Sequence, residues 1–131
     1  YSALGESDEK MLLARAIQMF MPGKPQIWYL DLFAGKNDHE AVQRAGESGH
    51  KEINRTNLST DQITEGLKKD VVQKQLALIR MRNTHKAFSE GAEVAISGGE
   101  SSLQIRWEYN SAFATLYVNF ESGTYTIVES R

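Results

Sequence analysis

The sequence predicts an α/β fold, with one buried strand inside a helical region and a small antiparallel β unit after it. Apolar residues run without interruption from Ile27 to Leu30, and helical patterns precede and follow them. A strand that is apolar on both faces and flanked by helices is typical of a parallel sheet covered by helices. From Ala92 onward the apolar period changes to two, with turn residues between four short runs, which is typical of an antiparallel meander.

The first helix is predicted to begin near Ser7 or Asp8, because either side chain suits a helix start, and to continue to about Met21. After the strand, residues 31–57 form a long irregular region with one short helical piece at 38–44. Loops of this length in compact domains are usually functional or disordered. The interleaved glycines, charges and asparagines of this region favour a functional loop.

Two more helices are predicted after this loop. Ser59 and Gln62 form a capping box that starts a short helix, and Gly66 is placed as the stop after its last turn. Asp70 and Gln73 form a second capping arrangement, ahead of a longer helix that we expect to pack on the sheet.

Composition limits the class of protein. The chain has 131 residues, no cysteine, and a net charge of −2. This length suits one domain or the tail of a larger protein, and because the chain begins at Tyr1 without an initiator Met we expect a segment of a longer polypeptide. The lack of cysteine fits a reducing, cytoplasmic compartment. The charge gives no global attraction to nucleic acid, and no apolar run approaches the ~20 residues that span a bilayer, so neither partner is expected.

Candidate functional residues lie at the end of the predicted strand and in the loop. Asp31 ends the strand, and the carboxyl ends of strands carry the chemistry of open α/β sheets and barrels. His50 and Lys51 could present positive charge to an anionic substrate or could be solvated surface. Asp31 with residues 38–40 matches no metal-ligand spacing, so no metal is expected. Neither a nucleophile triad nor an acid/base carboxylate pair is recognisable.

Six short sequence words resemble, in order, the carboxyl-terminal part of sucrose phosphorylase and related glucoside phosphorylases. The words lie at residues 1–5, 14–18, 20–26, 32–38, 53–55 and 72–83. Phe-Met-Pro-Gly-Lys-Pro-Gln before the predicted strand is also similar to the wider α-amylase superfamily. Ala-Gly-Lys-Asn-Asp followed by Ile-Asn-Arg narrows the resemblance to the phosphorylase branch. Residues 89–131 resemble the family in character only.

The resemblance implies the end of a catalytic (β/α)₈ TIM barrel in residues 1–88 and a C-terminal antiparallel β domain in residues 89–131. Within the barrel part it implies the seventh helix, the eighth strand, an inserted substrate-side subdomain and the eighth helix, at residues 7–21, 26–31, 32–66 and 70–84. The implied strand has no parallel partner in this sequence, so an isolated segment is expected to associate with a second copy through its strand edge or to rearrange its first helix.

The same resemblance implies a retaining double displacement, in which a glucosyl group passes through a covalent aspartyl intermediate to phosphate and leaves as α-glucose 1-phosphate. In this family the nucleophile Asp, the acid/base Glu and the stabilising Asp lie on earlier strands, so the segment alone is expected to be inactive. The implied partners are a sugar substrate and inorganic phosphate, in a cytoplasmic homodimer without a cofactor.

One departure from the family concerns the acceptor. Typical sucrose phosphorylases read Gly-Arg-Asp-Ile-Asn-Arg where this sequence reads His-Lys-Glu-Ile-Asn-Arg. Lys51 keeps the positive charge of that Arg but not its bidentate fork. The candidate substrate- and phosphate-binding residues are Lys51, His50, Asn54, Arg55 and Asp31. The candidate substrates are sucrose, sucrose 6-phosphate and glucosylglycerate; the alternatives are an α-amylase-superfamily hydrolase and a non-catalytic carbohydrate-binding or interaction module.

Overall fold

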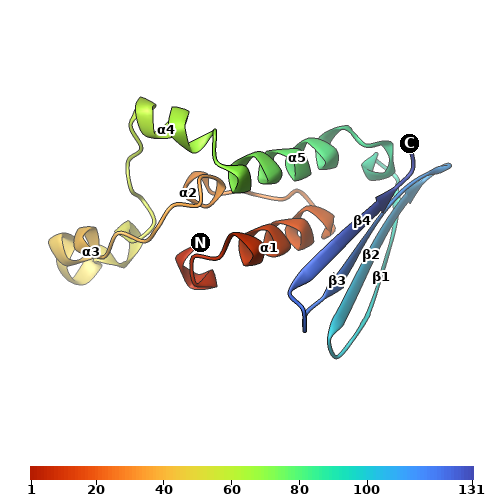
Figure 1. The fold of residues 1–131 in the computed structure, drawn as a ribbon, viewed down its shortest axis with the longest axis horizontal. Coiled ribbons are helices and arrows are strands. Elements are labelled where there is room, and N and C mark those ends of the chain that lie inside the picture. The colour runs from red at the N-terminus through yellow and green to blue at the C-terminus, as the bar shows by residue number, and fades with distance from the viewer.

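Two long helices form the centre of the molecule, with a β-sheet at one end and a small helical lobe at the other (Figure 1). The computed structural model describes the backbone of residues 1–131 and every side chain except that of Ser48. The amino terminus lies beside the central helices, and the carboxyl terminus lies at the sheet (Figure 1).

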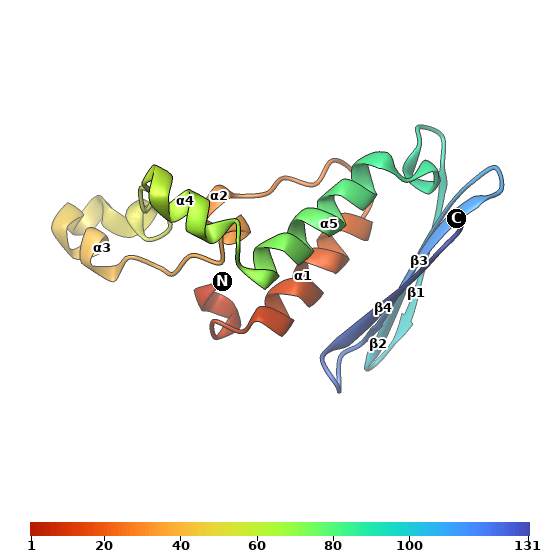
Figure 2. The same cartoon turned by 45° about the horizontal axis from the view of Figure 1, so that its top comes forward.

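The central helices are α1 (Asp8–Phe20) and α5 (Asp70–Thr84), which lie side by side and run in the same direction (Figures 1 and 2). A short 3-10 helix, η1 (Ser2–Leu4), precedes α1. The hydroxyl of Ser7 accepts a hydrogen bond from the backbone N–H of Lys10, so the predicted start of α1 is confirmed.

The predicted strand at residues 26–31 is wrong. Residues 24–28 pair with no strand, and α2 (Tyr29–Leu32) is a single helical turn. A strand requires neighbouring strands to exchange backbone hydrogen bonds, and the sheet in the described backbone uses residues 93–129 alone. The segment instead returns along the central helices as an unpaired connection and ends in a turn after α2 (Figure 2).

The helical lobe follows that turn. It consists of α3 (His39–Ala45) and the 3-10 helix η2 (Gly46–Glu52), so the short helix predicted at 38–44 is confirmed. Asp38 caps α3, because its carboxylate accepts a hydrogen bond of 2.8 Å from the backbone N–H of Ala41.

The next helix, α4 (Thr60–Gly66), begins with the predicted capping box. Ser59 accepts from the backbone N–H of Gln62, and the Gln62 side chain accepts from the backbone N–H of Ser59. Gly66 is not the C′ stop that the sequence suggested, since it is the last helical residue. It is buried against Phe33, where an added Cβ would lie 2.6 Å from Cδ1, so close packing requires the glycine.

The cap predicted for α5 is also wrong. Asp70 is the first helical residue, and the N-cap is Lys69, whose side chain makes no capping bond. The Gln73 side chain donates instead to the carbonyl of Leu67. Asp70 forms an ion pair of 2.6 Å with Lys74, one turn further along the helix surface.

The sheet is the antiparallel meander that the sequence predicts. After the short 3-10 helix η3 (Lys86–Phe88), the strands are β1 (Glu93–Gly99), β2 (Ser102–Tyr109), β3 (Ala112–Asn119) and β4 (Thr124–Glu129), in the order β1-β2-β3-β4. Each strand pairs with its neighbour in sequence, because short turns join them.

One hydrophobic core joins the sheet to the helices. Met19 and Phe20 of α1 are almost fully buried against Ile105, Trp107 and Leu116 of the sheet. The indole N–H of Trp107 donates a buried hydrogen bond of 2.6 Å to the carbonyl of Phe20. This bond satisfies an end-of-helix carbonyl that α1 itself leaves without a partner.

Among the described helices, none combines the length and the apolar composition that crossing a bilayer requires.

Candidate functional site

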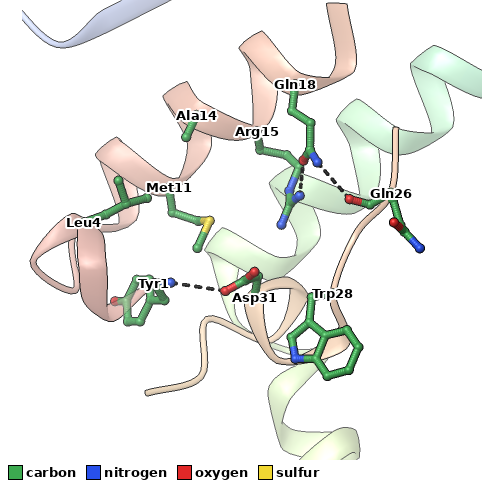
Figure 3. Close-up of a pocket in the computed structure, with 9 residues that line it drawn as sticks. All are labelled: Tyr1, Leu4, Met11, Ala14, Arg15, Gln18, Gln26, Trp28 and Asp31. Atoms are coloured by element: carbon green, nitrogen blue, oxygen red, sulfur yellow. Dashed lines mark hydrogen bonds and ion pairs between the residues drawn. The ribbon is translucent and has the colours of Figure 1, made fainter. Parts of the chain in front are cut away.

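A polar pocket lies between η1, α1 and the segment that leads into α2 (Figure 3). Its volume is about 330 Å³. Both apolar and polar side chains line it. The lining residues are Tyr1, Leu4, Met11, Ala14, Arg15, Gln18, Gln26, Trp28 and Asp31. The sequence analysis placed one of these residues, Asp31, in the candidate site.

Arg15 is the centre of a hydrogen-bond network at this pocket. Its side chain is only 5% exposed, and its Nε donates to the Gln75 side-chain oxygen at 2.9 Å while Nη1 donates to the Gln18 side chain. Gln18 in turn donates to the carbonyl of Gln26 at 2.8 Å, and Gln75 donates to the carbonyl of Leu32 at 3.0 Å (Figure 3). The network therefore holds the segment that leads into α2 at two points, Gln26 and Leu32.

The pocket contains charges of both signs. Burial lowers the pKa of the Arg15 guanidinium from its ordinary value, and the nearby carboxylate of Asp31 partly opposes this shift. Arg15 stays protonated at neutral pH because arginine does not lose its proton in proteins. The Asp31 carboxylate lies 3.2 Å from the amino nitrogen of Tyr1 (Figure 3). A hydroxyl-rich ligand could find both donors and acceptors here.

The other four predicted site residues lie on or just after η2. His50 and Lys51 are exposed at its end, and Asn54 and Arg55 follow. Arg55 lies 3.5 Å from the Glu52 carboxylate, so part of its charge is balanced locally.

Gly49 sets how closely η2 approaches α3. It is buried, and an added Cβ would lie 2.4 Å from the carbonyl oxygen of Val42. This position therefore accepts only glycine without a shift of one helix from the other. His50 and Lys51 follow Gly49 directly, so the packing of Gly49 determines where these two residues lie.

Two aromatic residues that the sequence analysis missed connect the pocket to this segment. The indole N–H of Trp28, which lines the pocket, donates to the carbonyl of Asn54 at 2.7 Å. The hydroxyl of Tyr29 donates to the carbonyl of Thr56 at 2.8 Å. The available signal was the polar atom on each ring, because a Trp or Tyr in a buried strand still needs a hydrogen-bond partner.

The structure does not bring the five predicted residues into one bonded cluster. Among the described side chains, no hydrogen bond or ion pair joins Asp31 to His50, Lys51, Asn54 or Arg55. Nor do three His, Asp or Glu side chains converge within the described part of the chain. The predicted residues form two groups, one in the pocket and one beyond it.

Comparison with known proteins identifies relatives along the whole chain, although no protein-family model matches it. The chain is 52% identical over 127 residues to the sucrose 6(F)-phosphate phosphorylase of Ilumatobacter coccineus, which covers 97% of this chain and 24% of that protein. It is 42% identical over 130 residues to the sucrose phosphorylase of Agrobacterium vitis, with 99% and 26% covered. The crystal structure of sucrose 6F-phosphate phosphorylase from Thermoanaerobacter thermosaccharolyticum matches with a TM-score of 0.91 and 39% identity, over 100% of this chain and 26% of that one.

These similarities first define a class: the relatives are glucoside phosphorylases, and the chain spans about a quarter of their length. It belongs to the sucrose phosphorylase family. Its helices and antiparallel sheet match the carboxyl-terminal part of a solved phosphorylase, so the resemblance seen in the sequence is confirmed.

Proposed function

We propose that the chain is the carboxyl-terminal quarter of a retaining glucoside phosphorylase with a (β/α)₈ barrel. In such a barrel, consecutive helices run parallel and a returning segment joins them. The parallel pair α1 and α5, joined by the connection that ends at α2, supports this arrangement (Figure 2). In the intact protein the rest of the barrel would then lie beside this connection. The barrel would end near residue 88, and residues 89–131 would form the appended β domain.

The reaction we propose is phosphorolysis of sucrose or a related α-glucoside. A carboxylate would displace the acceptor sugar from the glucosyl group, and phosphate would then displace the carboxylate, giving α-glucose 1-phosphate. The catalytic carboxylates would come from outside residues 1–131, so this segment would supply binding groups. Sugar and phosphate are the partners, and a cytoplasmic homodimer is the assembly that we propose from the family resemblance.

Among the candidate substrates, sucrose 6-phosphate has the strongest support. The observation that carries this choice is the Lys51 side chain, which lies exposed beside His50 and makes no ion pair among the described side chains. A relative at 52% identity is named a sucrose 6(F)-phosphate phosphorylase. Lys51 would bind the phosphate of the acceptor or the attacking phosphate as a point charge, because an ammonium group does not require planar, bidentate geometry. His50, Asn54 and Arg55 would contribute hydrogen bonds around it.

Asp31 has a different proposed role. Its carboxylate lies in the polar pocket with Arg15, where it could accept hydrogen bonds from sugar hydroxyls. This role would make Asp31 a sugar-binding group on the side of the site away from Lys51.

The test uses the full-length enzyme that contains this segment and the substitution Lys51→Ala. We expect the KM for sucrose 6-phosphate or for inorganic phosphate to rise about tenfold or more, because a charged hydrogen bond contributes about 1.5–3 kcal/mol. Lys51→Arg keeps the charge and serves as the matched control, with a smaller rise expected. Unchanged KM values for both compounds in Lys51→Ala would contradict the proposed role of Lys51.

The hydrolase alternative is tested on the same enzyme by the products. A phosphorylase releases α-glucose 1-phosphate at a rate that depends on phosphate, whereas a hydrolase releases glucose whether or not phosphate is present. If neither α-glucose 1-phosphate nor glucose is released from any α-glucoside, the result would favour the carbohydrate-binding or interaction module.

A further inference from the structure

The side chains of Trp28 and Tyr29 bind the main chain of residues 54–56. They are neighbours in the sequence, and their rings lie 5.0 Å apart. Each uses its one N–H or O–H group on a backbone carbonyl, Trp28 on Asn54 and Tyr29 on Thr56. The two acceptors are two residues apart, so the aromatic pair holds a short stretch of main chain at two points.

Burial alone does not explain why these rings lie where they do. Within residues 1–131, Trp28 is 43% exposed and Tyr29 37% exposed, so packing inside this segment leaves much of both side chains uncovered. The hydrogen bonds of 2.7 Å and 2.8 Å are the specific contacts that each ring makes with residues 54–56.

The lobe that carries His50 and Lys51 is attached at its stem. The backbone N–H of Asp38 donates to the carbonyl of Ile53 at 2.8 Å, which closes the base of the lobe. The backbone N–H of Asn37 donates to the hydroxyl of Ser2 at 2.9 Å. The aromatic pair holds the main chain immediately after Ile53. The stem bonds therefore decide how the lobe is oriented relative to the polar pocket.

Asn54 is only three positions after Lys51 in the chain, a span of at most about 10 Å. A turn shortens this span further, because the backbone N–H of Arg55 donates to the carbonyl of Glu52 at 3.1 Å. Because the chain between them is short, a displacement of the Asn54 carbonyl would also displace the backbone of Lys51.

We infer that Trp28 and Tyr29 are positioning residues, which hold the Lys51 segment in a fixed place relative to the polar pocket that contains Asp31. This inference rests on the proposed function, because it assigns the pair a role in binding the phosphate-bearing partner. The ring of Trp28 lines the pocket while its N–H holds the segment, so one side chain couples the sugar-binding side to the anion-binding side.

The experiment compares Trp28→Phe, Tyr29→Phe and the double variant in the full-length enzyme. Each substitution removes one hydrogen-bond donor and keeps an aromatic ring. The control is Tyr117→Phe, which removes a hydroxyl from an exposed tyrosine on β3. We expect the double variant to raise the KM for sucrose 6-phosphate or phosphate about three- to tenfold, with kcat changed less than about twofold. The control should leave both parameters unchanged.

A double-mutant cycle with Lys51→Ala tests whether the aromatic pair acts through Lys51. If it does, the aromatic substitutions have little further effect once Lys51 is gone, so the effects are not additive. Full additivity, or an unchanged KM in the double variant while Lys51→Ala raises it, would overturn the inference and leave the proposed function standing.

Hydrogen exchange tests whether Trp28 and Tyr29 hold residues 50–56 in place, independently of any effect on substrate binding. We expect the backbone amides of residues 50–56 to exchange faster in the double variant than in the wild type or the control. If Lys51→Ala leaves every KM unchanged, the proposed function fails. The anchoring is then judged by exchange alone: faster exchange supports it, and unchanged exchange overturns it.

Discussion

At the scale of single residues, buried polar groups do most to define this structure. Arg15 on α1 donates to Gln75 on α5, and the other hydrogen bonds of their network end on Gln18 or on the connecting segment. Removing one partner would leave a buried donor or acceptor without a bond, which costs about 1–3 kcal/mol. The network thereby fixes a segment that has no strand partners in this chain.

Tyr125 shows how burial at this scale gives a measurable pH dependence. Burial between β4 and α5 raises the pKa of its phenol from the ordinary 10.0, and Lys74 partly opposes the shift. The folded state therefore favours the neutral phenol. Its contribution to stability is fully present below about pH 10 and is lost as the pH rises through the higher folded-state pKa.

We therefore predict that Tyr125→Phe makes the loss of stability above pH 10 shallower than in the wild type, as measured by urea unfolding at a series of pH values. Lys74→Gln should move the ultraviolet titration of Tyr125 to still higher pH, because it removes the opposing charge. Equal pH slopes for Tyr125→Phe and the wild type would contradict this assignment.

At the scale of elements, caps and glycines decide where helices begin and how closely they pack. Ser59 and Gln62 satisfy each other's backbone donors at the start of α4. At its end, Gly66 allows Phe33 to pack directly on the helix backbone. The lobe uses the same device, since Gly49 lets η2 approach the Val42 carbonyl of α3.

The packing of the lobe leads to a prediction for Gly49→Ala. The new methyl group would overlap the Val42 carbonyl, so η2 must shift, at a cost of about 1–3 kcal/mol. We expect a raised KM for the phosphorylated substrate, because His50 and Lys51 follow directly. Gly99→Ala is the control, since its methyl group would lie at an ordinary 3.5 Å from the Ser102 hydroxyl. Equal kinetics for the two variants would show that the lobe tolerates the shift.

At the scale of the whole molecule, the sheet and the central helices share one core. The carbonyl of Phe20 accepts the Trp107 indole N–H, and the Arg82 guanidinium lies 4.3 Å from the Trp107 ring. Arg82 also donates to the carbonyl of Gly23 at 2.9 Å, so α5, the end of α1 and β2 meet at one point. The helices and the sheet should therefore stabilise each other.

This arrangement predicts that Trp107→Phe weakens the helices as well as the sheet. The substitution leaves the buried Phe20 carbonyl without its donor, which costs about 1–3 kcal/mol. Hydrogen exchange on the full-length protein should show faster exchange in both α1 and β2. Trp28→Phe is the comparison variant: any faster exchange should be confined to residues 50–56 and leave α1 and β2 unchanged, because Trp28 is 43% exposed and is not part of this core. Faster exchange confined to the sheet would show that the two parts unfold separately.

Local patterns in the sequence determined most of the elements. Ser7 and Ser59 were predicted as helix starts, and the antiparallel meander was predicted from its period of two, because caps and alternation act between near neighbours. The family also follows from short words in the sequence, and the comparisons confirm it.

What the tertiary structure decided are the features that depend on distant partners. The apolar run from Ile27 to Leu30 satisfies every local rule for a strand, yet a strand exists only where another strand shares its hydrogen bonds, and here α2 follows an unpaired connection. The bonds from Trp28 and Tyr29 to residues 54–56 span more than 25 positions, so nothing in the sequence near either ring reveals them. The sequence thus determined the family and the local elements, while folding in three dimensions decided how the segment that carries Lys51 is held.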